Sequence, residues 1–360
     1  DFVKSDFYRF SSEEGYVSRR LVKLSPDPRD YGRALRPLDE KKVFSFPMNT
    51  WTGIYRRSFL EEFGIRHNET PGASYQDNGF WFQTFCFARK AAFLNGAYYM
   101  NRRDNPNSSV YDAGKVYAAC REYAHIDELL RAHPRLRREA APCFWLKKYH
   151  NYVFTLQRIA YKYRREFAAR MREEFFAAGG PDMSLMSGRE REELSVLAKD
   201  PQAFLRRLGL AAEEEPFLTV VIVRGGGAFL RTFAAVANQT CGNIQIVAAG
   251  GGFTEEEREF LRGDKRAELC ERPGASPAEA LAAALALGRG RYVHILPAVA
   301  VPSAGLYAAV WKRLSLQPAD VVLCRALAET AGGAVCDLKN FRVGANTEAL
   351  RADPYMLDRC

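Results

Sequence analysis

The sequence has 360 residues, of which 47% are hydrophobic and 26% charged, a composition typical of globular chains that excludes collagen-like and extensively disordered proteins. The formal net charge is +9, and 36 of the 52 Lys and Arg residues lie within residues 1–212, so the first part is basic and the rest nearly neutral. A basic surface attracts phosphates of any kind, so charge alone does not distinguish nucleotide, lipid and nucleic-acid partners.

The first 135 residues predict a mixed α/β segment. Residues 1–10 alternate weakly between apolar and polar side chains and predict a strand, and a Pro-containing loop follows over residues 26–37. Apolar spacing predicts helices over residues 51–64 and 78–94, the first of them ended by Gly64. A strand is expected over residues 97–100, and a polar loop over residues 102–109.

Residues 136–212 predict a helical region. Apolar residues recur every three or four positions over residues 144–176, which predicts one long helix carrying eight basic residues, namely Lys147, Lys148, Arg158, Lys162, Arg164, Arg165, Arg170 and Arg172. Such a helix either lies on an anionic membrane or packs its apolar stripe on a neighbouring domain with its charges in solvent, and the second reading is favoured. A break is expected at Gly179 and Gly180, a further helix over residues 189–208, and a linker over residues 211–216.

Residues 216–360 predict a second α/β domain. Strands are expected over residues 217–223, 244–248, 267–271, 292–296 and 321–324, alternating with helices over residues 228–238, 254–261, 277–287 and 304–314. Such regular alternation predicts a parallel sheet covered by helices.

Metal and membrane signals are weak throughout the sequence. The eight cysteines form no Cys-x-x-Cys pair, which argues against a zinc site and against a compact disulfide framework. No apolar run approaches the roughly 20 residues that cross a bilayer, and the start at Asp1 does not resemble a signal peptide. We therefore expect a cytoplasmic protein, with peripheral contact at the inner face of the membrane as the alternative, and further sequence upstream of Asp1.

Asp77 is the leading candidate for chemistry. It stands where a Gly/Pro-rich loop, Pro71-Gly-Ala-Ser-Tyr-Gln-Asp77, meets the predicted aromatic helix. A carboxylate at a helix N-terminus is held in its ionised form and can accept a proton from a substrate hydroxyl. The simpler alternative is an Asp that only caps the helix.

Further candidates are expected to bind substrate. Trp51 offers a flat ring to a cyclic substrate or else packs in the core, and the side chains of Gln76 and Asn78 bond either substrate hydroxyls or local backbone groups. Arg102, Arg103, Ser108 and Ser109 lie on the polar loop, where guanidinium groups suit phosphate oxygens. The same stretch also has the composition of a solvated turn.

The segment around Asp77 resembles the acceptor side of bacterial family-2 glycosyltransferases of the GT-A type. The resemblance implies that Asp77 is the general base that activates the acceptor sugar, that Trp51 flanks the acceptor pocket, and that the Arg102–Ser109 loop closes over the leaving diphosphate. It also implies that residues 1–135 lack a nucleotide-binding half, which we expect upstream. The expected partners are a nucleotide-sugar donor and a saccharide or lipid-linked acceptor in cell-envelope or exopolysaccharide synthesis.

Residues 216–360 resemble the nucleotide-binding half of the same family but lack its acids. Ala248-Ala-Gly-Gly-Gly252 stands where the family carries nucleotide-binding acids, and Pro297-Ala-Val299 stands where the metal-binding Asp-x-Asp belongs. We therefore expect an inactive copy of the fold that binds no metal, with a Mg or Mn ion held by the upstream motif. The alternative is a non-catalytic glycan-binding or assembly module. Binding of nucleic acid has no supporting motif.

Overall fold

The computed structural model describes residues 1–13, 16–70, 75–103, 115–177, 179–211, 215–224, 228–322, 324, 327–329 and 335–337. It shows a mixed α/β protein that divides into two compact units, Asp1–Ala308 and Ala309–Cys360. Ser108 and Ser109 lie outside the described residues.

A five-stranded mixed sheet opens the first unit. Its strands are β1 (Phe2–Glu13), β2 (Tyr16–Val22), β3 (Ala34–Leu35), β4 (Gly53–Tyr55) and β5 (Ala91–Arg102). The order is β2-β1-β5-β3, and β4 pairs with the beginning of β1. β1 runs parallel to β5 and antiparallel to β2 and β4. Short helices join these strands, namely the 3-10 turns η1 (Pro28–Asp30) and η2 (Lys41–Ser45) and helix α1 (Arg57–Glu62).

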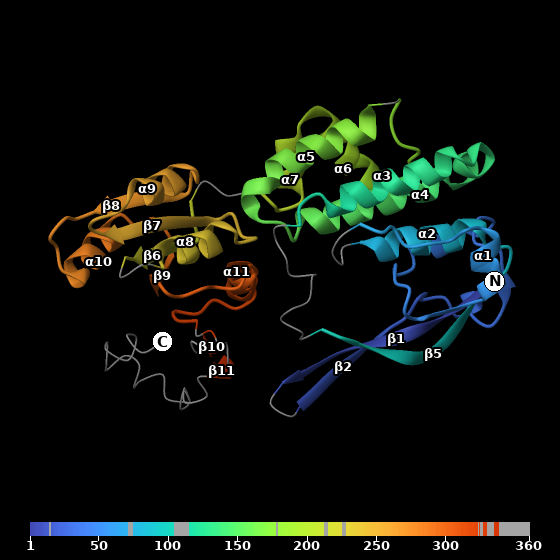
Figure 1. The fold of residues 1–360 in the computed structure, drawn as a ribbon, viewed down its shortest axis with the longest axis horizontal. Coiled ribbons are helices and arrows are strands. Elements are labelled where there is room, and N and C mark those ends of the chain that lie inside the picture. The colour runs from blue at the N-terminus through green and yellow to red at the C-terminus, as the bar shows by residue number, and fades with distance from the viewer. Residues whose placement is uncertain are drawn as a thin grey trace. The chain divides into compact units, whose positions relative to one another are not determined.

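Helix α2 (Gln76–Phe87) lies between this sheet and the helices α3 (Ala118–Arg131) and α4 (Pro134–Leu156) (Figure 1). Every residue from Asn78 to Cys86 is buried, as expected for a helix that is covered on all sides. Helices α5 (Tyr161–Phe176), α6 (Gly188–Lys199) and α7 (Pro201–Arg207) complete the layer. One apolar core runs without interruption from Phe2 to Leu205.

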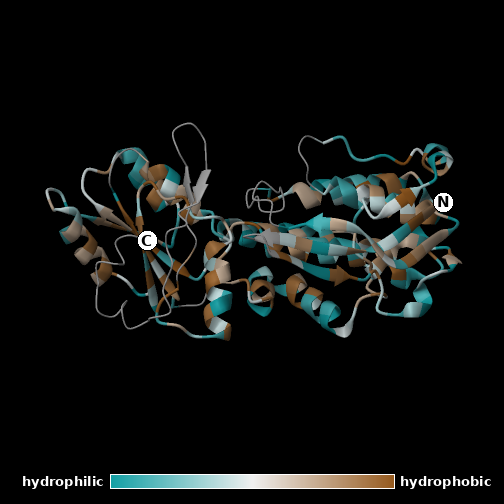
Figure 2. Ribbon diagram, turned by 90° about the horizontal axis from the view of Figure 1, so that it is seen from below, coloured by the Kyte–Doolittle hydropathy of each residue, from teal (hydrophilic) through white to brown (hydrophobic). Residues whose placement is uncertain are grey.

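A separate parallel sheet follows, with the order β8-β7-β6-β9. Its strands are β6 (Leu218–Val223), β7 (Ile244–Gly250), β8 (Ala267–Glu271) and β9 (Tyr292–Pro297). The connecting helices are α8 (Phe229–Ala237), α9 (Glu255–Arg262) and α10 (Pro277–Ala286). Many helices of the chain alternate between hydrophobic and hydrophilic stretches in Figure 2, as amphipathic helices packed on a core do.

Helix α11 (Leu306–Leu316) crosses into the second unit, which also contains the antiparallel pair β10 (Leu327–Glu329) and β11 (Val335–Asp337). The strand predicted over residues 321–324 is wrong, because Val321, Val322 and Cys324 are in no strand. The other predicted elements of this half agree with the structure to within two residues at each end.

Four predicted helices of the first part are wrong in extent. The helix predicted over residues 78–94 ends at Phe87, because the side chain of Asp1 accepts hydrogen bonds from the backbone N–H groups of Arg89 and Lys90 and the chain then enters β5. The helix predicted over residues 51–64 starts only at Arg57, since residues 53–55 pair with β1. Gly64 ends it as predicted, with a φ of +60°.

The single helix predicted over residues 144–176 is two helices, α4 and α5, separated at residues 157–160. The helix predicted over residues 189–208 likewise divides at Asp200, whose side chain caps α7 and is followed by Pro201.

Three of the eight basic residues assigned to that long helix are buried, namely Lys147, Lys148 and Arg164. The ammonium of Lys148 lies 3.0 Å from the Glu174 carboxylate among aromatic rings, and that of Lys147 donates to the Phe46 carbonyl at 2.7 Å. These cations pack within the protein and do not form a solvated face. None of the helices among the described residues is long and apolar enough to cross a bilayer.

The start of α2 is fixed by a buried carboxylate from α3. Glu122 accepts a hydrogen bond from the backbone N–H of Gly79 at 2.9 Å and another from the side chain of Asn68 at 3.0 Å. A β-carbon at position 79 would collide with this carboxylate. Gly79 is therefore required for the close approach of α2 and α3, although its backbone is ordinary helix.

Gly79→Ala is expected to destabilise the protein by about 1–3 kcal/mol, because overfilling a packed contact forces the surrounding side chains apart. Urea denaturation measures the change. Gly188→Ala is the matched control, since Gly188 also lies in a helix and its added methyl would meet nothing. A control loss as large as that of Gly79→Ala would contradict the steric argument.

The buried Lys147 predicts a pH-dependent stability. Burial lowers the pKa of its ammonium from 10.5 to about 7, so between these values the unfolded chain binds a proton that the folded chain does not. Stability should therefore rise with pH from about 7 towards 10.5. Lys147→Met should be more stable than the wild type near pH 7, and this advantage should shrink by pH 9.5. The exposed substitution Lys199→Met should show a difference that does not change with pH, as measured by urea denaturation at each pH.

Candidate functional site

Asp77 lies in the first turn of α2, but it is not the helix cap. The cap position belongs to Tyr75, whose φ of +66° makes it the single non-glycine residue with a left-handed backbone among the described residues. The Tyr75 hydroxyl lies 3.0 Å from the hydroxyl of Thr155 on α4, which holds this strained residue in place. The position of Asp77 at the helix N-terminus agrees with the sequence prediction. Asp77 does not occupy the cap position, but its carboxylate accepts hydrogen bonds from two backbone N–H groups of the first turn, as the capping alternative also expects.

The Asp77 side chain is partly buried, and burial raises the pKa of its carboxyl above the ordinary 3.8. Hydrogen bonding by the backbone N–H groups of Asp77 and Asn78 acts in the opposite direction, as do the charges of His67 and Lys4, without cancelling the effect of burial. A carboxylate with a raised pKa is a stronger base than an ordinary Asp, because it holds an accepted proton more tightly.

Lys4 on β1 is a member of this site that sequence reasoning missed. It is 1% exposed, and its ammonium donates to the Asn49 side-chain oxygen at 3.0 Å and to the Asn49 backbone carbonyl. The Thr52 hydroxyl donates to the same side-chain oxygen at 2.6 Å. Burial lowers the pKa of Lys4 to about 7, and the charge of Asp77 partly offsets this. The sequence feature that could have identified Lys4 was a lysine that stands between residues of a buried strand.

Glu122 is a second carboxyl group beside Asp77. Burial raises the pKa of Glu122, and the charge of Asp77 raises it further. Because both oxygens of Glu122 already accept hydrogen bonds from Gly79 and Asn68, its role is to hold the start of α2. Asp77 is the member of the pair that is partly open to solvent.

The side chains of Gln76 and Asn78, on either side of Asp77, bond to neighbouring protein groups. The Gln76 amide donates to the Thr70 carbonyl at 3.1 Å. The Asn78 amide donates to the side-chain oxygen of Asn151 on α4 at 3.0 Å. These bonds fix the first turn of α2 on both sides of Asp77, and a contact of either residue with a substrate hydroxyl stays a prediction.

Trp51 is partly buried between two aromatic rings. Its ring meets the edge of Phe7 at a centroid distance of 4.8 Å and stacks on Tyr99 at 4.4 Å. One face of Trp51 is therefore used by Tyr99. Its neighbour Thr52 belongs to the Lys4 network, so the chain places Trp51 next to the residues that support Asp77.

Arg102 and Arg103 lie at the end of β5, where the backbone N–H of Arg103 donates to the carbonyl of Phe10 at 2.8 Å. Both are exposed. The structure anchors the start of the predicted phosphate loop to β1, and the rest of that loop falls outside the described residues.

The second sheet places no carboxylate at the two strand ends where the family that it resembles carries acids. β7 ends in Ala248, Ala249 and Gly250, and β9 ends in Leu296 and Pro297. Glu271, at the end of β8, is paired with Arg258 at 2.8 Å. Among the described residues, no group of three or more His, Cys, Asp or Glu side chains gathers as metal ligands.

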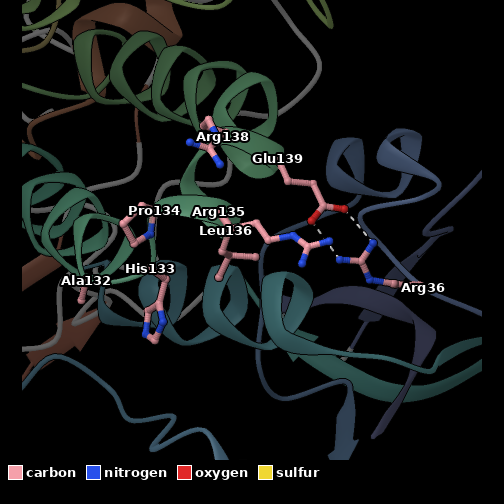
Figure 3. Close-up of a pocket in the computed structure, with 8 residues that line it drawn as sticks. All are labelled: Arg36, Ala132, His133, Pro134, Arg135, Leu136, Arg138 and Glu139. Carbon is pink, nitrogen blue, oxygen red and sulfur yellow. Dashed lines mark hydrogen bonds and ion pairs between the residues drawn. The ribbon is translucent and has the colours of Figure 1, made fainter.

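A surface cavity of about 870 Å³ lies at the start of α4. Figure 3 shows its lining, including His133, Arg135 and Arg138, with Arg36 and Glu139 joined by a two-pronged ion pair with N–O distances of 2.6 and 3.0 Å. None of the sequence-predicted site residues lines it.

Neither a comparison with models of known protein families nor a comparison with curated proteins yields a match to this chain.

Lys4→Met is expected to raise the pKa of Asp77, because the variant removes a nearby positive charge that stabilises the carboxylate. Titration of the Asp77 carboxyl carbon by NMR measures the shift. The exposed Lys42→Met is the control and should leave the pKa of Asp77 unchanged. An unaltered Asp77 titration in Lys4→Met would show that Lys4 serves the fold alone.

Proposed function

We propose that residues 1–135 form the acceptor side of a GT-A glycosyltransferase that moves a sugar from a nucleotide-sugar donor to a saccharide or lipid-linked acceptor, with Asp77 as general base. The observation that carries the proposal is the position of Asp77 in the first turn of a buried helix, with a raised pKa and partial access to solvent. The resemblance of the Pro71–Asp77 segment to family-2 glycosyltransferases supplies the reaction class.

In the proposed reaction Asp77 takes the proton from an acceptor hydroxyl as the hydroxyl oxygen forms a bond to the anomeric carbon of the donor sugar. The bond from that carbon to the diphosphate oxygen breaks, and its electron pair leaves with the diphosphate. Attack opposite the leaving group inverts the anomeric centre. The fixed turn between Tyr75 and Asn78 supports this role, because a base that is held in place needs less reorganisation to meet the hydroxyl.

Residues 216–360 are proposed to be a copy of the donor-binding half that has lost catalytic function. The parallel order β8-β7-β6-β9 is that of one half of a dinucleotide-binding fold. The alanine, glycine and proline residues at the ends of β7 and β9 offer no charge to a nucleotide or a cation.

Asp77→Asn, in the protein as its gene encodes it, is expected to lower the turnover number by about 10²- to 10⁴-fold, the usual contribution of a general base. Release of nucleoside diphosphate from a panel of nucleotide sugars measures turnover. Asp39→Asn, at an exposed carboxylate paired with Arg36, is the matched control. Unchanged turnover in Asp77→Asn would refute the assignment and favour a glycan-binding module.

A further inference from the structure

An exposed group of arginines lies on the outer part of the first sheet, where β1, β2 and β5 run side by side. Arg9 of β1 is directly opposite Arg20 of β2, and its neighbour on the other side is Asn101 of β5. Arg103 follows the end of β5. We refer to Arg9, Arg20, Asn101 and Arg103 as the arginine surface.

The repulsion between these like charges destabilises the folded protein. Partial burial lowers the pKa of Arg9, and the charges of Arg103 and Arg20 lower it further. Like charges directly opposite one another on neighbouring strands destabilise a sheet. Within the part of the chain that the structure describes, no carboxylate forms an ion pair with Arg9 or Arg20. A bound anion would relieve this repulsion.

An aromatic group borders the arginine surface. The guanidinium of Arg9 lies over the Phe7 ring at 5.9 Å, and Phe7 meets the edge of Trp51, which stacks on Tyr99. Guanidinium groups beside flat rings suit a ligand in which a phosphate is joined to a sugar or a base.

Strand register separates the two arginines that sequence reasoning treated as a pair. Arg102 is opposite Phe10, whereas Asn101 is opposite Arg9. Because successive side chains of a strand point to opposite faces, Arg102 is on the other face of the sheet from Arg9. The charge of Arg103, in contrast, acts on Arg9.

We propose that the arginine surface binds the phosphate or diphosphate group of a ligand, with Arg9 and Arg20 as its main contacts. The inference rests on the proposed glycosyltransferase function for the class of ligand, and it adds two residues from β1 and β2 to the expected phosphate contact of Arg103. The facing guanidinium groups of Arg9 and Arg20 match a phosphate or diphosphate, with two or more negative charges, better than a single carboxylate. The phosphate belongs either to a soluble nucleotide or to a lipid headgroup.

Calorimetry with inorganic pyrophosphate and with uridine diphosphate tests the soluble source, and sedimentation with vesicles containing 30 mol% phosphatidylglycerol, roughly the charge of an anionic leaflet, tests the lipid source. The double variant Arg9→Gln/Arg20→Gln should bind the preferred probe at least tenfold more weakly than the wild type. Arg121→Gln/Arg165→Gln removes the same charge from two exposed helical positions and should bind as the wild type does.

Thermal unfolding tests whether misfolding of the double variant, and not the loss of the two arginines, causes a loss of binding. The double variant of Arg9 and Arg20 should unfold at the same temperature as the wild type or higher, because it removes like-charge repulsion. A wild type that binds none of the three probes, or a control variant that loses binding equally, would overturn the proposal. So would binding of a single-stranded RNA 12-mer through these arginines without binding of the phosphate probes.

Asp77→Asn separates this proposal from the proposed reaction. It should retain phosphate binding while losing turnover. Loss of turnover in Asp77→Asn with no phosphate binding by the wild type would sustain the reaction and reject the arginine surface. Phosphate binding that depends on Arg9 and Arg20, with turnover unaffected by Asp77→Asn, would sustain the arginine surface and reject Asp77 as the general base.

Discussion

The hydrogen bond from the Gly79 backbone to the Glu122 carboxylate holds the start of helix α2 against α3, and Asp77 lies in that first turn. A helix start leaves backbone N–H groups without partners, and here a carboxylate from α3 satisfies one of them inside the protein. The Asn78–Asn151 and Tyr75–Thr155 contacts tie the same turn to α4. Three separate contacts therefore hold the first turn of α2, while Asp77 itself keeps partial access to solvent.

The sequence was most informative where side-chain pattern alone decides structure. The second sheet followed from its alternating strands and helices, because a parallel sheet repeats one local pattern that each segment satisfies by itself. The first part was harder. Apolar spacing predicts that the helix continues over residues 88–94, and only the hydrogen bonds accepted by Asp1, 88 residues away, show why it stops at Phe87. Contacts between residues so far apart in the sequence produce no recognisable pattern in the residues around the helix end.

The residues of the candidate site likewise fall into those that the sequence pattern identifies and those that only the packing of distant elements reveals. Asp77 could be found because a loop-to-helix boundary is visible in the sequence, as could the arginines at the end of β5. Lys4 was missed, since a lysine in a strand normally points to solvent, and its burial against Asn49 depends on the packing of a distant loop. Glu122 resembled any acidic residue on a helix surface. Its role becomes visible only when α3 is placed against α2.

The uninterrupted core from Phe2 to Leu205 has a practical meaning for anyone who wishes to shorten this protein. Cutting near residue 135 would sever α4 just after its first residue, Pro134, and strip Asn151 and Thr155 from the turn that carries Asp77. The shortest truncated variant that keeps the Asp77 carboxylate in its position therefore has to extend through α7, even though that helix is distant from Asp77 in the sequence.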